Sequence, residues 1–417
     1  MMAEPRTPSL QPAEGGTAGT LVASSAPGQP ILSARIVVLL AGLAAISILS
    51  TNIILPAFAD IGQELGVPTR ALGLTLSSFF ITFALAQLIV GPLADRYGRK
   101  KLVLGGLSLF VAGTAVAGFA TTLETLLLGR IIQALGVCAA AVLSRAIARD
   151  LFEGENLARA LSLTMIATAA APGFSPLIGS LLTSTLGWRA IFALVALAAI
   201  AIAIFYARGL GETHPPERRA PHSPLSVLRA YGGLLRDRRF VLPAVSVSLL
   251  MSGLFASFGA APAILMSGIG LTSLEAGLYF AATVFVVFAA GMAAPHLARR
   301  YGSRKITALG FATALAGGLV LIVGPADPGL AWYSLSMVIF LWGMGLANPL
   351  GTAITLNPFG KEAGLASALL GFLTMGASAV TTWLGSASDF APVTTLGVTQ
   401  ASVCLVAIIL FLFTHRT

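Results

Sequence analysis

Long runs of apolar residues recur along the chain, separated by short polar segments. Twelve runs have about the twenty residues that an α-helix needs to cross a hydrocarbon core. They cover residues 36–59, 71–93, 102–121, 124–147, 160–184, 190–208, 241–266, 275–298, 306–324, 331–355, 363–386 and 393–413. A membrane barrel strand would instead alternate apolar and polar positions. The pattern predicts an all-α integral membrane protein with twelve transmembrane helices.

Composition supports a membrane protein over a soluble one. The 417 residues are 56% hydrophobic and 10% charged, with a mean hydropathy of +0.90. Soluble domains carry about 25% charged residues. They also lack the interior volume to hide so much apolar surface.

Positive charge is unevenly distributed between the two sides of the predicted helices. All Lys and Arg residues except Arg70, Arg130 and Arg189 lie on the side that holds both termini. This bias predicts a multi-pass protein of the plasma membrane, the inner membrane in a bacterium, with both termini cytoplasmic. The bilayer is the expected partner, and attraction to its anionic inner leaflet accounts for the net charge of +9 without a nucleic-acid partner.

Breaks in the apolar pattern divide the chain into four parts. They are a disordered cytoplasmic tail (1–34), a six-helix bundle (35–209), a cytoplasmic linker (210–240) and a second six-helix bundle (241–414). In the linker, Leu225, Leu228, Tyr231 and Leu235 recur at helical spacing among arginines. This spacing favours an interfacial helix, with an irregular linker as the alternative.

The two bundles share a sequence pattern. Leu93-Ala-Asp-Arg-Tyr-Gly-Arg-Lys-Lys101 matches Leu297-Ala-Arg-Arg-Tyr-Gly-Ser-Arg-Lys305 at six positions, 204 residues later. Such a repeat predicts two pseudo-symmetric six-helix bundles with a substrate site between them near the midplane.

Several motifs resemble those of the major facilitator superfamily. Gly91-Pro-Leu-Ala-Asp-Arg-Tyr-Gly-Arg-Lys100 resembles its signature between helices 2 and 3, and Arg130-x-x-Gln133-x-x-Gly136 resembles its helix 4 motif. Ala171-Pro-Gly-x-x-Pro176-x-x-Gly179 resembles the helix 5 motif of its drug antiporters, and other segments resemble the bicyclomycin-resistance-type exporters with twelve helices. The resemblance implies a secondary active transporter, not an enzyme, that works by alternating access as a monomer.

The same resemblance assigns residues to a gate. Asp95, one turn after Gly91, is expected to cap the start of helix 11 and hold the cytoplasmic side closed, where Gly91 lets the backbones approach. Arg96 and Arg99 are expected to pair with Asp150. The remaining gate residues are Gly98 and, for bending of helix 5, Pro172, Pro176 and Gly179. The alternatives are charges that only set topology and prolines that only adjust packing.

Arg130 lies some 9 Å inside the membrane at 1.5 Å per residue. A buried Arg is costly there and should face a cavity with partners, unless it extends to the outer surface. In the family this arginine is linked to proton coupling. Relatives usually carry an acid in helix 1 where this chain has Asn52, which leaves Asp60 and Glu124 as candidate proton carriers.

The resemblance places helices 1, 4, 7 and 10 around the substrate. Their candidate binding residues are Asn52, Arg130, Gln133, Met251, Phe255, Phe258, Trp342 and Asn348. Met and aromatic walls with few polar groups favour small amphipathic organic molecules over sugars, although each of these side chains could simply pack.

Two functions are compatible with these residues. The first is export of lipophilic small molecules, of the multidrug type, in exchange for protons. The second is import or exchange of a metabolite without proton coupling, which Asn52 favours. A channel would show rings of pore-lining residues, and none is visible. The spacing of His and Cys predicts no metal site, and no cofactor is expected.

Overall fold

A computed structural model describes residues 33–218, 224–325 and 328–414. Its helices are α1 (Ala34–Asn52), α2 (Phe58–Leu65), α3 (Gly73–Tyr97), α4 (Arg99–Gly118), α5 (Leu123–Leu151), α6 (Gly154–Leu186), α7 (Arg189–Gly209), α8 (Pro224–Arg236), α9 (Arg238–Ala261), α10 (Ser273–Tyr301), α11 (Ser303–Val323), α12 (Leu330–Leu356), α13 (Ala363–Ala387) and α14 (Pro392–Phe413). Short helical turns η1 (Leu55–Ala57), η2 (Thr69–Leu72), η3 (Pro216–Arg218), η4 (Pro262–Gly268) and η5 (Asn357–Glu362) connect or extend them. Within these residues, twelve helical segments are long and apolar enough to cross a membrane, which confirms the predicted fold class.

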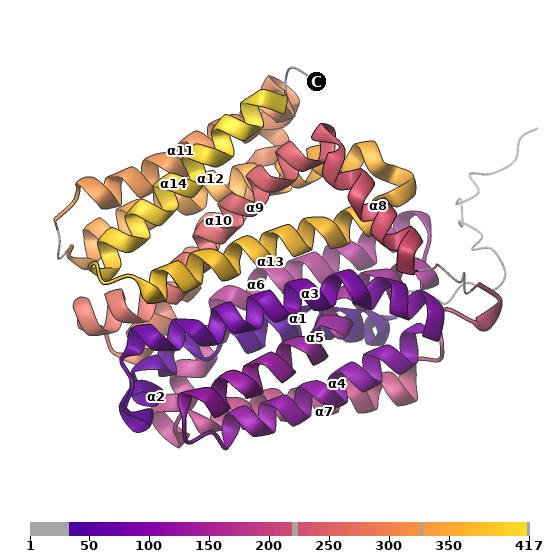
Figure 1. The fold of residues 1–417 in the computed structure, drawn as a ribbon, viewed down its shortest axis with the longest axis horizontal. Helices are drawn as coiled ribbons and strands as arrows, with labels where there is room; N and C mark the ends of the chain where they lie inside the picture. Colours follow the sequence, from indigo (N-terminus) through magenta and orange to yellow (C-terminus); the bar gives the residue numbers. More distant parts are fainter. Residues whose placement is uncertain (1–32, 219–223, 326–327, 415–417) are drawn as a thin grey trace, which may run out of the picture.

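The helices form two bundles that lie side by side. Helices α1–α7 make one and α9–α14 make the other (Figure 1). We call the end of the molecule that carries α8 the linker end, and the end that carries α2 and η2 the far end. Of the predicted tail, residues 1–32 lie outside the described residues.

The two bundles repeat one packing arrangement. A Cβ on Gly136 of α5 would collide with the backbone of Gly106 and Phe110 on α4. A Cβ on Gly343 of α12 would collide in the same way with Gly310 and Ala314 on α11, each 204 residues after its counterpart on α4. Small residues let these helix pairs approach closely. The predicted pseudo-symmetry is therefore present in the packing.

The repeated loop motif also has a common backbone. Gly98 ends α3 with φ 92°, and Gly302 ends α10 with φ 91°. Positive φ is costly for residues with a side chain, so glycine stops both helices sharply. The helices run on through polar residues to these caps, which is why α3 and α10 extend past the apolar runs 71–93 and 275–298.

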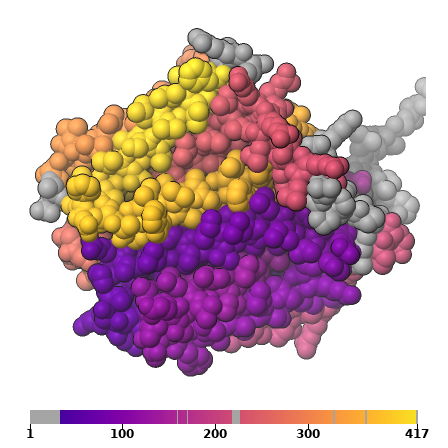
Figure 2. Space-filling model, in the orientation of Figure 1, coloured from indigo at the N-terminus to yellow at the C-terminus, as the bar shows by residue number. Residues whose placement is uncertain are grey.

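Two seams join the bundles. Helices α3 and α13 run side by side along the face drawn in Figures 1 and 2, where indigo-purple atoms meet yellow ones. Helices α6 and α10 form the second seam. There, a Cβ on Gly173 would collide with Val284, and one on Gly277 would lie 3.0 Å from Leu177 Cα. The α6–α10 seam is tightly packed toward the far end.

The linker contains helix α8, as its leucine spacing predicts. Its Tyr231 is buried with Leu234 among residues of α9 and α13. Burial raises the pKa of Tyr231, so its hydroxyl stays protonated and donates a 3.2 Å hydrogen bond to the Leu88 carbonyl of α3. Helix α8 thus touches both bundles.

Candidate transport site

Arg130 lies at the centre of a buried polar network. Its Nη1 donates to the Ser50 carbonyl of α1 at 2.9 Å and to Oε1 of Gln133 at 2.8 Å. Gln133 Nε2 donates in turn to the Thr114 hydroxyl of α4 at 2.8 Å. The network connects three helices of one bundle. Because Arg130 is 0% exposed, the alternative in which it extends to the membrane surface is wrong.

The network leaves hydrogen-bonding capacity unused. Nε and Nη2 of Arg130 have no partner among the described residues, and Oδ1 of Asn52 has none there either. The guanidinium carbon lies 4.6 Å from the centre of the Phe79 ring, a cation–π contact. Buried groups without partners are rare, which marks this network as a candidate functional site.

Aromatic rings bridge the two bundles beside this network. Phe80 of α3 lies 4.7 Å from Phe255 of α9, measured between ring centres. Phe258 stands 6.1 Å from Phe255 and 5.9 Å from Phe280 of α10. Because these residues lie in the far-end halves of their helices, the rings block the space between the bundles toward that end.

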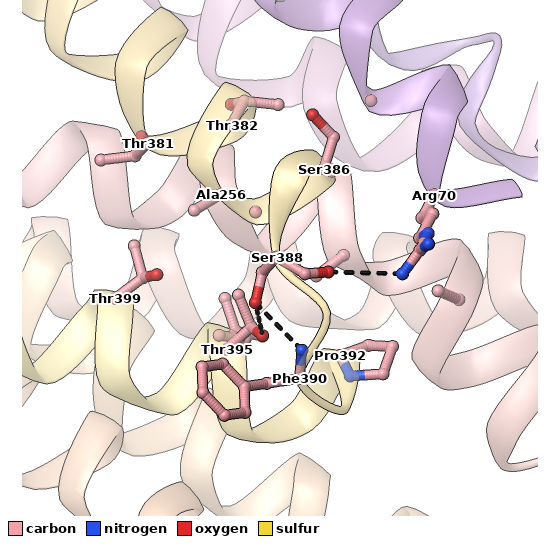
Figure 3. A pocket seen from close by; sticks show the side chains of 16 residues that line it. Arg70, Ala256, Thr381, Thr382, Ser386, Ser388, Phe390, Pro392, Thr395 and Thr399 are labelled. Atoms are coloured by element: carbon pink, nitrogen blue, oxygen red, sulfur yellow. Dashed lines mark hydrogen bonds between the residues drawn. The ribbon is translucent and has the colours of Figure 1, made fainter.

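The far end is closed by further contacts. A Cβ on Gly73, at the start of α3, would lie 3.1 Å from the Ser386 side chain of α13, so the two bundles are in close contact there. Arg70 donates to the Ser388 carbonyl at 3.5 Å (Figure 3). It also pairs with Asp389 at 3.3 Å, and both contacts link the bundles. The cavity drawn there, about 60 Å³, is large enough for little more than water.

The linker end, in contrast, is hollow. A cavity of about 540 Å³ lies between α3, α5, α8 and α13. Its lining comprises Gln87, Gly91, Pro92, Asp95, Arg99, Val142, Leu143, Arg145, Ala146, Arg149, Ser226, Val227, Ala230, Tyr231, Gly364, Leu365, Ser367 and Ala368. This volume is within the range of small-molecule sites.

An ion-pair network stands beside the cavity. Arg99 pairs with Asp95 at 2.7 Å and with Asp150 at 3.2 Å. Asp150 also accepts a hydrogen bond from Thr213 at 3.1 Å. Glu212 accepts from the backbone N–H groups of Arg99 and Lys100 and so caps the start of α4. All these groups belong to the first bundle and its linker.

Two expectations about the gate differ from the structure. Arg96 stacks on Tyr97 at 5.3 Å, and Arg99 alone makes the ion pair with Asp150 within the described residues. The close approach expected at Gly91 is absent, since a Cβ there would meet no described atom within 4 Å. The reason is the cavity, which separates Gly91 and Asp95 from Gly364 across its width.

The other predicted residues are scattered. Phe255 and Phe258 join the aromatic bridge, and Met251 is half-buried one turn before them. Trp342 is 38% exposed and Asn348 is half-buried, and none of the eight predicted binding residues lines either cavity described above. Asp60 and Glu124 are exposed at the far end. Pro172 and Pro176 lie within α6, which continues through both.

Some site residues carry no signal in the sequence. Phe79 and Phe80 look like ordinary lipid-facing residues in an apolar run. Glu212 looks like one more charge in a linker. The N–H groups that it caps, of Arg99 and Lys100, lie more than 110 residues earlier, so no local spacing could have suggested the cap.

Comparison with known proteins decides the family. The family model described as Major Facilitator Superfamily matches residues 40–382. The chain belongs to the Major Facilitator Superfamily. It is a transporter, not an enzyme, and its immediate surroundings are a lipid bilayer.

Relatives in this superfamily include transporters with multidrug names. The chain is 29% identical to Multidrug resistance protein D of Escherichia coli (strain K12) over 367 residues, 87% of this chain and 90% of that protein. It is also 29% identical to the uncharacterized MFS-type transporter YdgK of Bacillus subtilis (strain 168) over 340 residues, 81% and 85% of the two chains. The solved structure of the peptide transporter POT has the same fold, with a TM-score of 0.74 and 14% identity over 91% of this chain and 94% of that one.

Proposed function

We propose that this protein exports lipophilic small molecules by alternating access, with the linker end facing the cytoplasm. The observation that carries the proposal is the contrast between the ends: a cavity of about 540 Å³ at the linker end and closed packing at the far end. The concentration of arginines at the linker end supports its cytoplasmic placement. The name of the Escherichia coli relative supports the multidrug substrate class.

Transport would proceed by rocking of the two bundles about the α3–α13 and α6–α10 seams. Closing the cavity would bring Asp95 toward the first turn of α13, where a carboxylate complements free N–H groups. Arg99 and Asp150 would hold the linker end of the first bundle together meanwhile. This pair is largely buried, with side chains 9% and 17% exposed, so it would stay formed while the bundles move.

Exchange for protons is part of the proposal. Asp60 and Glu124 are the candidate carriers, and Arg130 would link their state to the substrate through the network with Gln133 and Ser50. A second candidate function, exchange of a metabolite without protons, is supported by one observation. The Oδ1 of Asn52, at the position where the family resemblance implies an acid, is buried without a partner among the described residues.

Everted membrane vesicles test the proposal. An inward proton gradient should drive accumulation of at least one lipophilic dye from a panel of cations and anions that includes ethidium. A protonophore should abolish this accumulation, and vesicles without the protein should show none. Failure of every dye would overturn the exporter. Accumulation that survives the protonophore would overturn proton exchange alone.

A further inference from the structure

The linker-end cavity has one strongly cationic wall. Arg145 and Arg149 stand one helical turn apart on α5, and both side chains are exposed to the cavity. Neither makes a hydrogen bond or ion pair within the described part of the chain, whereas Asp95, the carboxylate that lines the cavity, lies 2.7 Å from Arg99. Two guanidinium groups thus face the cavity without an ion-pair partner among the described residues. Such groups gain from an anionic partner.

The opposite wall is mostly apolar. Helix α8 contributes Val227 and Ala230, and α13 contributes Leu365 and Ala368. An occupant of the whole cavity would therefore need a negative group on one side and an apolar body on the other. Guanidinium groups bind carboxylate, sulfonate and phosphate through paired hydrogen bonds, which gives such a site its selectivity.

The two arginines are specific to the first bundle. The packing of Gly136 and Gly343 aligns α5 with α12 at a separation of 207 residues. At that separation Arg145 corresponds to Thr352 and Arg149 to Leu356. The second bundle therefore has no arginine at either position on α12.

We propose that the linker-end cavity binds amphiphilic organic anions, with the negative group between Arg145 and Arg149 and the apolar part against Val227 and Leu365. The proposal rests on the proposed export function and specifies its substrate class. An organic anion with a free negative group and a phospholipid headgroup share this chemistry. We assign the cavity to the free solute, because it opens between the bundles where a cytoplasmic molecule would enter.

Equilibrium binding to the purified full chain in a neutral detergent tests this assignment. Fluorescence anisotropy would report binding of carboxyfluorescein, an anion, and of ethidium, a cation. Arg145→Gln and Arg149→Gln should each weaken carboxyfluorescein binding about tenfold, the effect of one lost hydrogen bond between charged groups. Lysine at either position should restore part of the affinity, because the charge returns without the paired geometry. Arg299→Gln, an exposed arginine outside the cavity, is the matched control and should change nothing.

The possible outcomes separate the two proposals. Equal carboxyfluorescein affinity in wild type and in both glutamine variants would overturn the anion site. Accumulation of ethidium in vesicles would still support export in that case. Binding that depends on both arginines, with no dye accumulated in vesicles, would support the anion site and overturn the exporter. Binding of phosphatidylglycerol that depends on both arginines, with no binding of the dye, would reassign the cavity to a lipid headgroup. Each glutamine variant must first show a wild-type elution profile and unfolding midpoint, which indicate that it is folded. If a glutamine variant fails this check, the lysine variant at the same position is used for the comparison of affinities instead.

Discussion

In the first bundle, α5 places Arg130 and Gln133 in a polar network with α1 and α4, whereas the corresponding turns of α12 in the second bundle carry Met337 and Phe340. The backbones around these residues pack alike, through Gly136 in one bundle and Gly343 in the other. Equal packing with unequal chemistry shows that the repeat preserves the helix contacts while the side chains between them diverge.

The same asymmetry appears at the linker end. The first bundle carries the ion pairs of Asp95, Arg99 and Asp150, while the second has Arg299, Ser303 and Asn357 at the matching positions. One bundle therefore contributes charge to the cavity and the other contributes mainly apolar walls. A transporter built in this way can close when the apolar surface of the second bundle moves against the charged surface of the first.

The largest effect is expected where the two bundles differ most. Arg130→Met introduces the residue type found at Met337, the matching position of the second bundle. It removes the donor to Ser50 and Gln133, and each buried acceptor left unpaired costs about 1–3 kcal/mol. Dye accumulation in vesicles should fall below detection. Met337→Leu, the matched change in the other bundle, should cost less than about 1.5 kcal/mol and leave accumulation near wild type. Equal transport by the two variants would contradict the comparison.

The shared packing predicts equal losses of stability. Gly136→Ala and Gly343→Ala each insert a methyl group against a helix backbone, which costs about 1–3 kcal/mol. Thermal unfolding of the purified protein should show similar decreases in midpoint for both. Gly105→Ala, where a Cβ would meet no described atom within 4 Å, should not lower the midpoint. A loss in one bundle alone would show that the repeat is not structural.

The sequence is most informative where a single residue or a run of residues is compatible with few structures. Twenty apolar residues in a row have few alternatives to a spanning helix, and Arg130 stands out because a charge in such a run is costly. Contacts between residues that are far apart in the sequence cannot be predicted in this way. The contact of Phe80 with Phe255 and the cap that Glu212 supplies depend on partners that no local pattern names.

The open cavity is also beyond prediction from the sequence, because one chain passes through several arrangements. The motif predicts Asp95 against the first turn of α13, the contact of a closed linker end. In this structure the cavity separates them, and Asp95 pairs with Arg99 instead. The sequence specifies which residues can meet, and the state of the transporter decides which do.

A smaller effect is expected at Asp95. Asp95→Asn removes the 2.7 Å pair with Arg99 and the charge available to α13, so transport should fall several-fold. Stability should change little, since Asp95 is 35% exposed and Arg99 keeps its pair with Asp150. Arg299→Gln alters the matching position of the second bundle and should leave transport unchanged. Wild-type rates for Asp95→Asn would refute its role in closing the linker end.

The smallest effect is expected at the far end, where a charge pair connects the bundles directly. Arg70 and Asp389 lie 3.3 Å apart with side chains 55% and 95% exposed, so water screens their attraction. Arg70→Gln should change transport less than about twofold, in keeping with about 0–1 kcal/mol for exposed pairs. A double-mutant cycle with Asp389→Asn measures the pair itself. A coupling above about 1 kcal/mol would mean that this pair, rather than the aromatic bridge of Phe80 and Phe255, holds the far end closed.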